Sequence, residues 1–233
     1  LESHMMNNEN MNKCLDLLYR ETNPIINKKR NIVNNKYFVP YQKDSLFWIY
    51  YYMKYGYLEY NLVGSNSYSI ETEYKFKLIN IIKNNKNVFK DYKLQKINDC
   101  IANLSCEGET NFKTFIVLCI INNISFIYSV KKIYYSLIFD DTEDIFLIHY
   151  NNGIYGCEKI NNKNIEEYKK NKFEIKYYEK PIYSINNYTM DQLKEISNTL
   201  DLDVESNNKK IKKNELYNLI QCSIAKFYDS VII

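Results

Sequence analysis

One stretch of this chain is apolar or aromatic on nearly every side of a helical projection, residues 44–56, which read Asp-Ser-Leu-Phe-Trp-Ile-Tyr-Tyr-Tyr-Met-Lys-Tyr-Gly. Asp44 or Ser45 can cap the start of a helix, and Gly56 can end it. A helix without a polar face has to be surrounded by other elements. The stretch therefore predicts a central buried helix around which the domain is built.

The segments after this helix predict an α+β fold. Two helices are expected within residues 71–104 and another from Asn111, followed by strands at 124–130, 134–139, 145–150 and 154–160. A turn at 151–153 joins the last two strands. The helices precede neighbouring strands, which favours a helical N-terminal region packed on a small, mostly antiparallel sheet. A short helix and an exposed linker are expected within residues 11–35.

The last fifth of the chain predicts a small helical hairpin. Thr189 and Gln192 form a capping box, and a leucine-spaced first helix is followed by a second apolar stripe from Leu216 to Ile224. The polar segment 161–180 and Pro181 mark the predicted boundary between a main domain, residues 6–180, and this module, residues 181–233. Residues 1–5, Leu-Glu-Ser-His-Met, are typical of an expression-vector remnant.

Four lysines precede the second helix of the hairpin: Lys209, Lys210, Lys212 and Lys213. Lysines at a helix N-terminus can contact phosphates together with the free backbone N–H groups. The segment, with Lys213-Asn-Glu-Leu216, resembles the SAP-type helix–loop–helix module, and this resemblance implies DNA binding, often at A/T-rich sites. It departs from the family in lacking the turn glycine and in its long loop. Nearby carboxylates keep an alternative open, a hairpin docked on the main domain or on a protein partner.

A second resemblance concerns the start of the buried helix. Asp44-Ser45-Leu46-Phe47 is similar to the Asp-Cys-Leu-Phe start of the nucleophile helix in papain-like and OTU-like cysteine proteases, and His149 follows on a later strand. The resemblance implies a peptidase scaffold for a protein or ubiquitin-like substrate, with Ser45 and His149 as catalytic residues and Gln42 serving an oxyanion. Because Ser45 replaces the cysteine, we expect a degenerate scaffold. The alternative for His149 is a partly buried histidine at a strand end.

The amino-acid composition limits which partners and cofactors this chain is expected to bind. The 31 basic residues are nearly matched by 28 acidic ones, so any nucleic-acid surface has to be local. Six scattered cysteines without a Cys-x-x-Cys pair favour a reducing intracellular compartment and argue against a metal site. With five glycines and no phosphate-binding loop, no nucleotide cofactor is expected. The apolar runs fall short of the roughly 20 residues that cross a bilayer, which predicts a soluble protein without membrane contact.

The chain is rich in Asn, Ile, Lys and Tyr, whose codons are rich in A and T. Together with the two segments described above, this bias resembles proteins of large nucleocytoplasmic DNA viruses, which implies a protein of the host cytoplasm or the virion. We therefore expect a non-enzymatic, nucleic-acid-associated protein that binds DNA phosphates through the C-terminal hairpin. The alternatives are the papain-like or OTU-like scaffold and a virion or assembly protein acting through protein contacts only.

Overall fold

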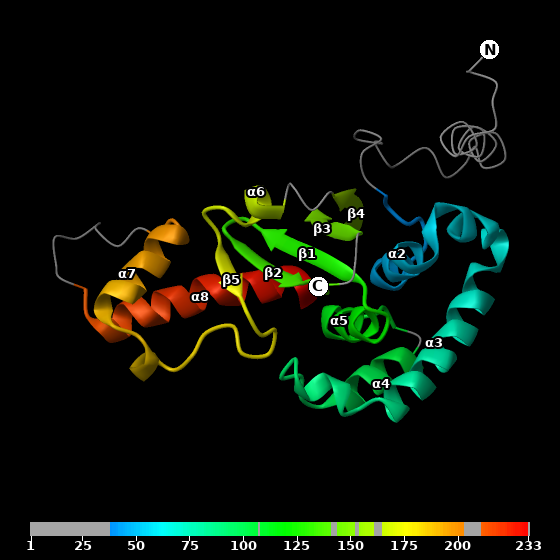
Figure 1. Cartoon of the computed structure of the whole chain (residues 1–233), viewed down its shortest axis with the longest axis horizontal. Helices are drawn as coiled ribbons and strands as arrows, with labels where there is room; N and C mark the ends of the chain where they lie inside the picture. Colours follow the sequence, from blue (N-terminus) through cyan, green and yellow to red (C-terminus); the bar gives the residue numbers. More distant parts are fainter. Residues whose placement is uncertain are drawn as a thin grey trace, which may run out of the picture. The chain divides into compact units, whose positions relative to one another are not determined.

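A computed structural model describes residues 38–106, 108–140, 144–151, 154–160, 165–202 and 211–232, with the side chains of residues 151 and 229–232 left aside. Residues 37–233 form one compact unit. The helix and linker expected within residues 11–35 lie outside the described residues. Figure 1 shows the elements in chain order.

The expected central helix is present as α2, Ser45–Leu62. Asp44 caps it, because its side chain accepts a hydrogen bond of 3.1 Å from the backbone N–H of Phe47. Gly56 was expected to end the helix. It interrupts the helical backbone with φ 82° and ψ 176°, a conformation essentially restricted to glycine, but α2 resumes beyond this kink and runs to Leu62. Its residues from Leu46 to Tyr50 are buried, which confirms that α2 is a core helix.

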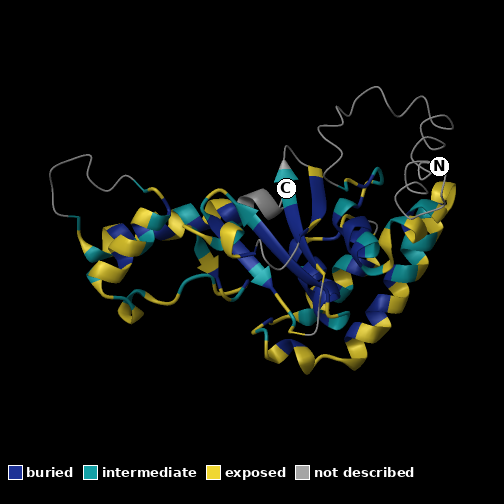
Figure 2. Cartoon of the chain, turned by 45° about the horizontal axis from the view of Figure 1, so that its top comes forward, coloured by how far each residue is buried: buried dark blue, intermediate teal, exposed yellow. Residues whose placement is uncertain are grey.

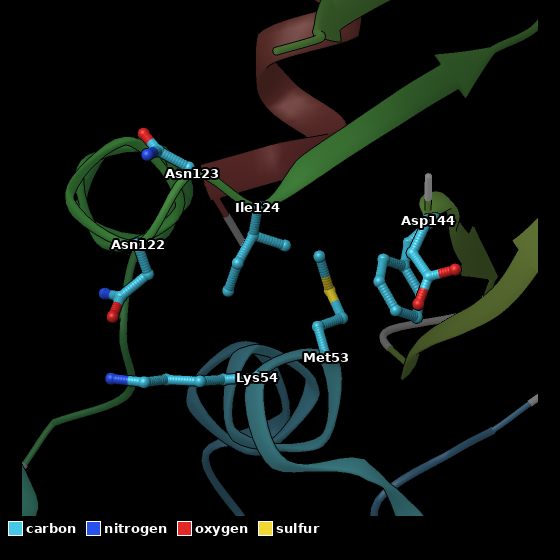
Figure 3. Close-up of a pocket in the computed structure, with 7 residues that line it drawn as sticks. Met53, Lys54, Asn122, Asn123, Ile124 and Asp144 are labelled. Atoms are coloured by element: carbon cyan, nitrogen blue, oxygen red, sulfur yellow. The ribbon is translucent and has the colours of Figure 1, made fainter. Parts of the chain in front are cut away.

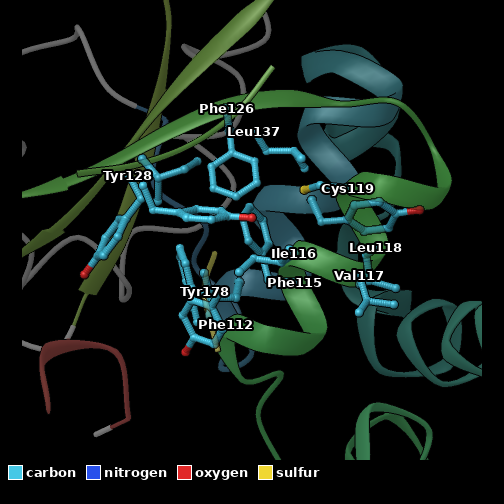
Figure 4. Close-up of a cluster of buried hydrophobic side chains, with 14 of the residues drawn as sticks. Phe112, Phe115, Ile116, Val117, Leu118, Cys119, Phe126, Tyr128, Leu137 and Tyr178 are labelled. Carbon is cyan, nitrogen blue, oxygen red and sulfur yellow. The ribbon is translucent and has the colours of Figure 1, made fainter. Parts of the chain in front are cut away.

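Three further helices follow: α3, Ser67–Asn84, α4, Ile97–Ser105, and α5, Phe112–Ile121. Asn111 caps α5 by accepting a 2.8 Å hydrogen bond from the N–H of Thr114. Helix α5 is apolar and its residues are buried nearly throughout. Figure 4 shows Phe112 and Phe115 facing strand β1, where ring centroids of Phe115 and Phe126 lie 5.1 Å apart. Helix α5 is therefore a second core helix, packed directly on the sheet.

The sheet has five strands in the order β4-β3-β1-β2-β5. They are β1, Ser125–Val130, β2, Ile133–Leu137, β3, Ile145–Asn151, β4, Ile154–Ile160, and β5, Phe173–Ile175. The pairs β1–β2 and β3–β4 are antiparallel, whereas β1–β3 and β2–β5 are parallel. The α+β class is confirmed. The sheet is mixed, with two antiparallel and two parallel strand pairs, because β3 and β5 reach their parallel partners by crossover connections.

The two faces of the sheet pack against different elements. Side chains from Phe126, Tyr128, Tyr155 and Cys157 belong to the main core with α2 and α5. The opposite face carries a smaller cluster that includes Ile165 and Tyr168 of α6, Ile165–Lys169: it also contains Ile127, Tyr134, Ile145, Leu147 and Ile160. In Figure 2 the strands are mostly buried, whereas α3 carries many exposed residues.

The predicted C-terminal hairpin is present as α7, Met190–Thr199, and α8, Lys213–Ile232. The capping box is formed: the N–H of Gln192 donates to Thr189 Oγ1 at 3.2 Å, and the N–H of Thr189 donates to Gln192 Oε1 at 2.8 Å. Leu193 and Leu216 are fully buried between the helices.

Helix α8 also belongs to the main core. The rings of Phe227 and Tyr128 of β1 lie 5.2 Å apart, and the hydroxyl of Tyr228 donates to the carbonyl of Tyr178 at 2.5 Å. Figure 1 shows α8 running from α7 to the sheet. The hairpin and the main domain therefore share one hydrophobic core across the expected boundary at residues 180–181.

Candidate functional site

Ser45, one of the three residues predicted for a catalytic site, is the first residue of α2. Ser45 lies at a groove of about 590 Å³. The groove lies between the N-termini of α2 and α5 and extends to Tyr155 of β4 and to Tyr178, which follows β5. Its lining residues are Lys43, Asp44, Ser45, Leu46, Glu109, Thr110, Asn111, Phe112, Lys113, Tyr155 and Tyr178. We call this surface the α2–α5 groove. A helix N-terminus there can stabilise negative charge.

His149 lies on the other face of the sheet. In the β3–β4 register Tyr150 pairs with Tyr155, which lines the α2–α5 groove, while His149 pairs with Gly156. Because successive side chains of a strand point to opposite faces, His149 points away from the groove. Its Nε2 lies 3.3 Å from Oε1 of Glu158, whose side chain is 5% exposed. The structure thus does not bring Ser45 and His149 together.

Gln42 is engaged elsewhere as well. Its Oε1 accepts a 2.7 Å hydrogen bond from the hydroxyl of Tyr60, and that hydroxyl accepts one of 3.2 Å from the N–H of Tyr41. Gln42 Nε2 is buried and has no hydrogen-bond partner among the described residues. The amide therefore ties the segment before α2 to the end of that helix, and it does not complete a site with Ser45.

A buried ionic network occupies the start of α2. Oδ2 of Asp44 accepts hydrogen bonds from Lys75 Nζ at 2.6 Å and from the N–H and Oγ1 of Thr110 at 2.9 and 2.7 Å. Lys75 also donates to Glu71 at 2.7 Å, and Glu71 accepts 2.7 Å from the indole of Trp48. Burial, the largest influence, lowers the pKa of Lys75, but Asp44 and Glu71 outweigh it and leave the pKa raised.

This network was not expected from sequence. Asp44 was predicted only as a cap, and the single local signal for more was the spacing of Glu71 and Lys75, four residues apart on one helix. The groups of this network satisfy one another's hydrogen bonds, and the charge of Asp44 is balanced by that of Lys75. The network joins α2, α3 and the start of α5 and stabilises the groove wall.

A second hollow, of about 340 Å³, lies between α2 and the start of β1. Figure 3 shows Lys54 and Asn122 on one side and Asp144 on the other, with Met53 and Ile124 between them. Lys54 donates to the hydroxyl of Tyr74 at 2.7 Å, and Asp144 pairs with Lys159 at 2.5 Å. The acid and the base are separated, so this hollow offers no proton-transfer pair.

Among the residues described, no group of three or more His, Cys, Asp or Glu side chains is placed to hold a metal ion. Within the same ranges, no helix has the length and apolar character needed to cross a membrane.

A group of lysines gathers where the β1–β2 turn meets the segment between α6 and β5. We call Lys131, Lys132, Lys169, Lys170 and Lys172 the basic rim. Backbone pairing holds its two halves together, since the N–H of Phe173 donates to the carbonyl of Lys132 at 2.8 Å. Helix α6 also carries Glu166 and Glu167, but at its first turn, so the lysines occupy the other end.

Lys172 is the most unusual member of the basic rim. Its ammonium donates to Ser129 Oγ at 2.8 Å and has no carboxylate partner among the described residues. Burial, and then the positive charge of Lys132, lower the pKa of Lys172. Lys132 in turn pairs with Asp201, just after α7, at 3.1 Å. The basic rim is therefore joined directly to the hairpin.

Of the four predicted hairpin lysines, Lys209 and Lys210 lie outside the described residues. Lys212 is exposed and Lys213, the first residue of α8, is partly exposed. The backbone N–H of Lys212 donates to Glu215 Oε2 at 3.1 Å, which caps the helix. In the described ranges, neither ammonium is within salt-bridge distance of a carboxylate, so both charges face solvent.

Comparison with protein-family models, with curated proteins and with solved structures finds no match for this chain. A functional assignment therefore rests on the arrangement of its own residues.

Proposed function

We propose that this chain is a non-enzymatic nucleic-acid-binding protein that contacts DNA phosphates through the basic rim and the start of α8. The observation that carries the proposal is the ammonium of Lys172, which lies beside Lys132 without a carboxylate of its own among the described residues. A phosphate placed there would counteract burial and the repulsion from Lys132, which together lower the pKa of Lys172. Salt-linked Lys132 and Asp201 connect this point to the hairpin.

The small net charge of +3 is compatible with such a surface because phosphate contacts need only a local excess of lysine. Lys212 and Lys213 extend the excess to the N-terminus of a helix of 20 residues, where unpaired backbone N–H groups and the helix dipole also favour phosphate. A peptidase function has no geometric support, since Ser45 and His149 lie on opposite sides of the sheet.

Titration of a short A/T-rich duplex with the full chain, followed by fluorescence anisotropy at several salt concentrations, tests the proposal. We compare two double variants, Lys131→Gln with Lys172→Gln and Lys212→Gln with Lys213→Gln. Each lysine that contacts a phosphate contributes about 0.9 to the slope of log K against log salt, so each double variant should flatten the slope by about 2.

The matched control is Lys83→Gln with Lys90→Gln, two exposed lysines near the end of α3 and in the turn after it. This pair removes the same charge and should leave the slope nearly unchanged. If the control weakens DNA binding as much as the test variants do, the attraction is non-specific and the proposed surface is wrong. Absence of salt-dependent binding by the unaltered chain would leave the protein-contact alternative in its place.

A further inference from the structure

The α2–α5 groove has the features of a binding site that the DNA proposal does not use. Two helices, of 18 and 10 residues, begin at its wall. The backbone N–H groups of Leu46, Phe112 and Lys113 belong to their first turns and have no acceptor among the described residues. Two sets of free donors and two positive dipole ends thus converge on one hollow, which suits an anion.

Tyr178 supplies an independent indication of a ligand. Its side chain lines the groove and is only 9% exposed, yet its hydroxyl makes no hydrogen bond with any described residue. Its ring packs on Phe112 with centroids 5.7 Å apart, and Figure 4 shows the two side chains together. Burial raises the pKa of Tyr178, which keeps its hydroxyl protonated as a donor. The ring is buried but the hydroxyl atom itself is accessible to solvent, so it is free to donate a hydrogen bond to a group bound in the groove.

Once the salt-bridged residues are set aside, the remaining charges around the groove favour binding of an anion. Asp44 is neutralised by Lys75 at 2.6 Å, and Lys113 pairs with Glu179. Lys43 is exposed and, within the described residues, has no carboxylate partner, so its charge is free to act at the rim. Glu109 is the remaining exposed carboxylate and opposes an anion. Among the described residues that line the groove, the two helix ends and Lys43 therefore act against one unpaired carboxylate.

We propose that the α2–α5 groove binds a phosphate monoester, with the phosphate at the N-termini of α2 and α5 and within reach of the Tyr178 hydroxyl. The organic part of the ligand would contact the apolar wall formed by Leu46, Phe112 and Tyr155. A hollow of about 590 Å³ accommodates a ligand of nucleotide size. This chemistry has two sources, a free phosphorylated metabolite and the phosphorylated end of a nucleic-acid strand.

Isothermal titration of the full chain with three probes tests the site: adenosine monophosphate, adenosine, and inorganic phosphate. Adenosine monophosphate should bind, inorganic phosphate should compete with it, and adenosine should bind at least tenfold more weakly. Tyr178→Phe keeps the ring and removes only the hydroxyl, so affinity should fall roughly tenfold through loss of one hydrogen bond to a charged group. Lys43→Gln should weaken and Glu109→Gln should strengthen binding, each by about two- to fivefold.

Lys226→Gln, on the exposed side of α8, is the matched control and should change nothing. A 5′-phosphorylated single strand and its unphosphorylated twin distinguish the sources: binding of the phosphorylated strand alone, lost in Tyr178→Phe, supports a strand end even where the mononucleotide fails. Equal affinity of Tyr178→Phe and the unaltered chain, equal binding of adenosine and its monophosphate, or binding of none of the phosphorylated probes would overturn the proposal.

The groove and the basic rim share no residues, so the two proposals fail separately. Lys131→Gln with Lys172→Gln should leave binding of adenosine monophosphate unchanged, and Tyr178→Phe should leave the salt dependence of duplex binding unchanged.

Discussion

Replacement of Asp44 by asparagine tests the physical account of the core most directly. Asparagine has the same shape, and its remaining oxygen can still accept the N–H of Phe47 and cap α2. Its amide nitrogen, however, cannot accept the bonds that Oδ2 receives from Lys75 and from the N–H of Thr110, whereas the Thr110 hydroxyl can rotate and accept a hydrogen bond from the amide. The substitution therefore removes the charge and two hydrogen bonds while keeping the helix cap.

The expected cost follows from the burial of the partners. Asp44, Lys75 and Thr110 are 4%, 6% and 4% exposed, so water cannot replace the lost acceptor. Breaking a buried ion pair by removing one partner costs about 3–5 kcal/mol, and the unsatisfied N–H of Thr110 adds to this. Lys75 keeps Glu71 at 2.7 Å, which reduces the loss. We expect the free energy of unfolding to fall by about 3–5 kcal/mol.

Urea denaturation followed by circular dichroism measures this change. With a slope near 2 kcal/mol per molar urea, the midpoint should fall by about 2 M without a change in slope. Asp191→Asn is the control, because Asp191 is 90% exposed and lies 3.9 Å from Lys194, and it should cost under about 0.5 kcal/mol. A double-mutant cycle with Lys75→Met should show a coupling of at least about 1 kcal/mol. A loss below about 1 kcal/mol for Asp44→Asn, or additive effects in the cycle, would refute the reasoning.

Two further predictions concern α8 and the buried tyrosines. Phe227→Ala should lower stability by about 3–5 kcal/mol in one cooperative transition, because Phe227 packs on Tyr128 of the sheet; a separate transition of the hairpin in calorimetry would contradict this. Burial, with a smaller effect of Cys157, raises the pKa of Tyr52 to about 12, and burial also raises the pKa values of Tyr50 and Tyr135. The unfolded chain loses these phenol protons first, so stability should fall as pH rises from the ordinary tyrosine pKa of about 10 toward 12, and constant stability across this window in urea titrations would count against it.

Much of the local structure was readable from the sequence. Strand β4 has the expected bounds, Ile154–Ile160, and Asn111 starts α5 as its position before an apolar run indicated. Helix α6 and strand β5 were missed, because elements of five and three residues leave no periodic pattern to detect. The parallel pairs β1–β3 and β2–β5 were also missed, since pairing between distant strands has no local signal.

The candidate site was less predictable than the fold. Ser45 was correctly placed at the start of a helix, and Lys212 and Lys213 beside the start of another. The partners of these residues were not predictable. The basic rim consists of lysines from two segments about 40 residues apart, and the α2–α5 groove depends on Tyr178, which has no motif around it.

The sequence by itself determined the buried helix α2 up to Gly56, its start at Asp44 or Ser45, the capping box of α7 and the alternation of the strands. These features depend on interactions within a turn or between next-nearest residues. Only the tertiary structure decided which face of the sheet meets α2 and α5, and hence that His149 lies across the sheet from Ser45. It also decided that Asp44 meets Lys75 and Thr110, and that α8 completes the main core. These contacts join residues far apart in the chain. The local sequence pattern is compatible with several pairings of the elements, and the burial of apolar side chains in one shared core decides between them.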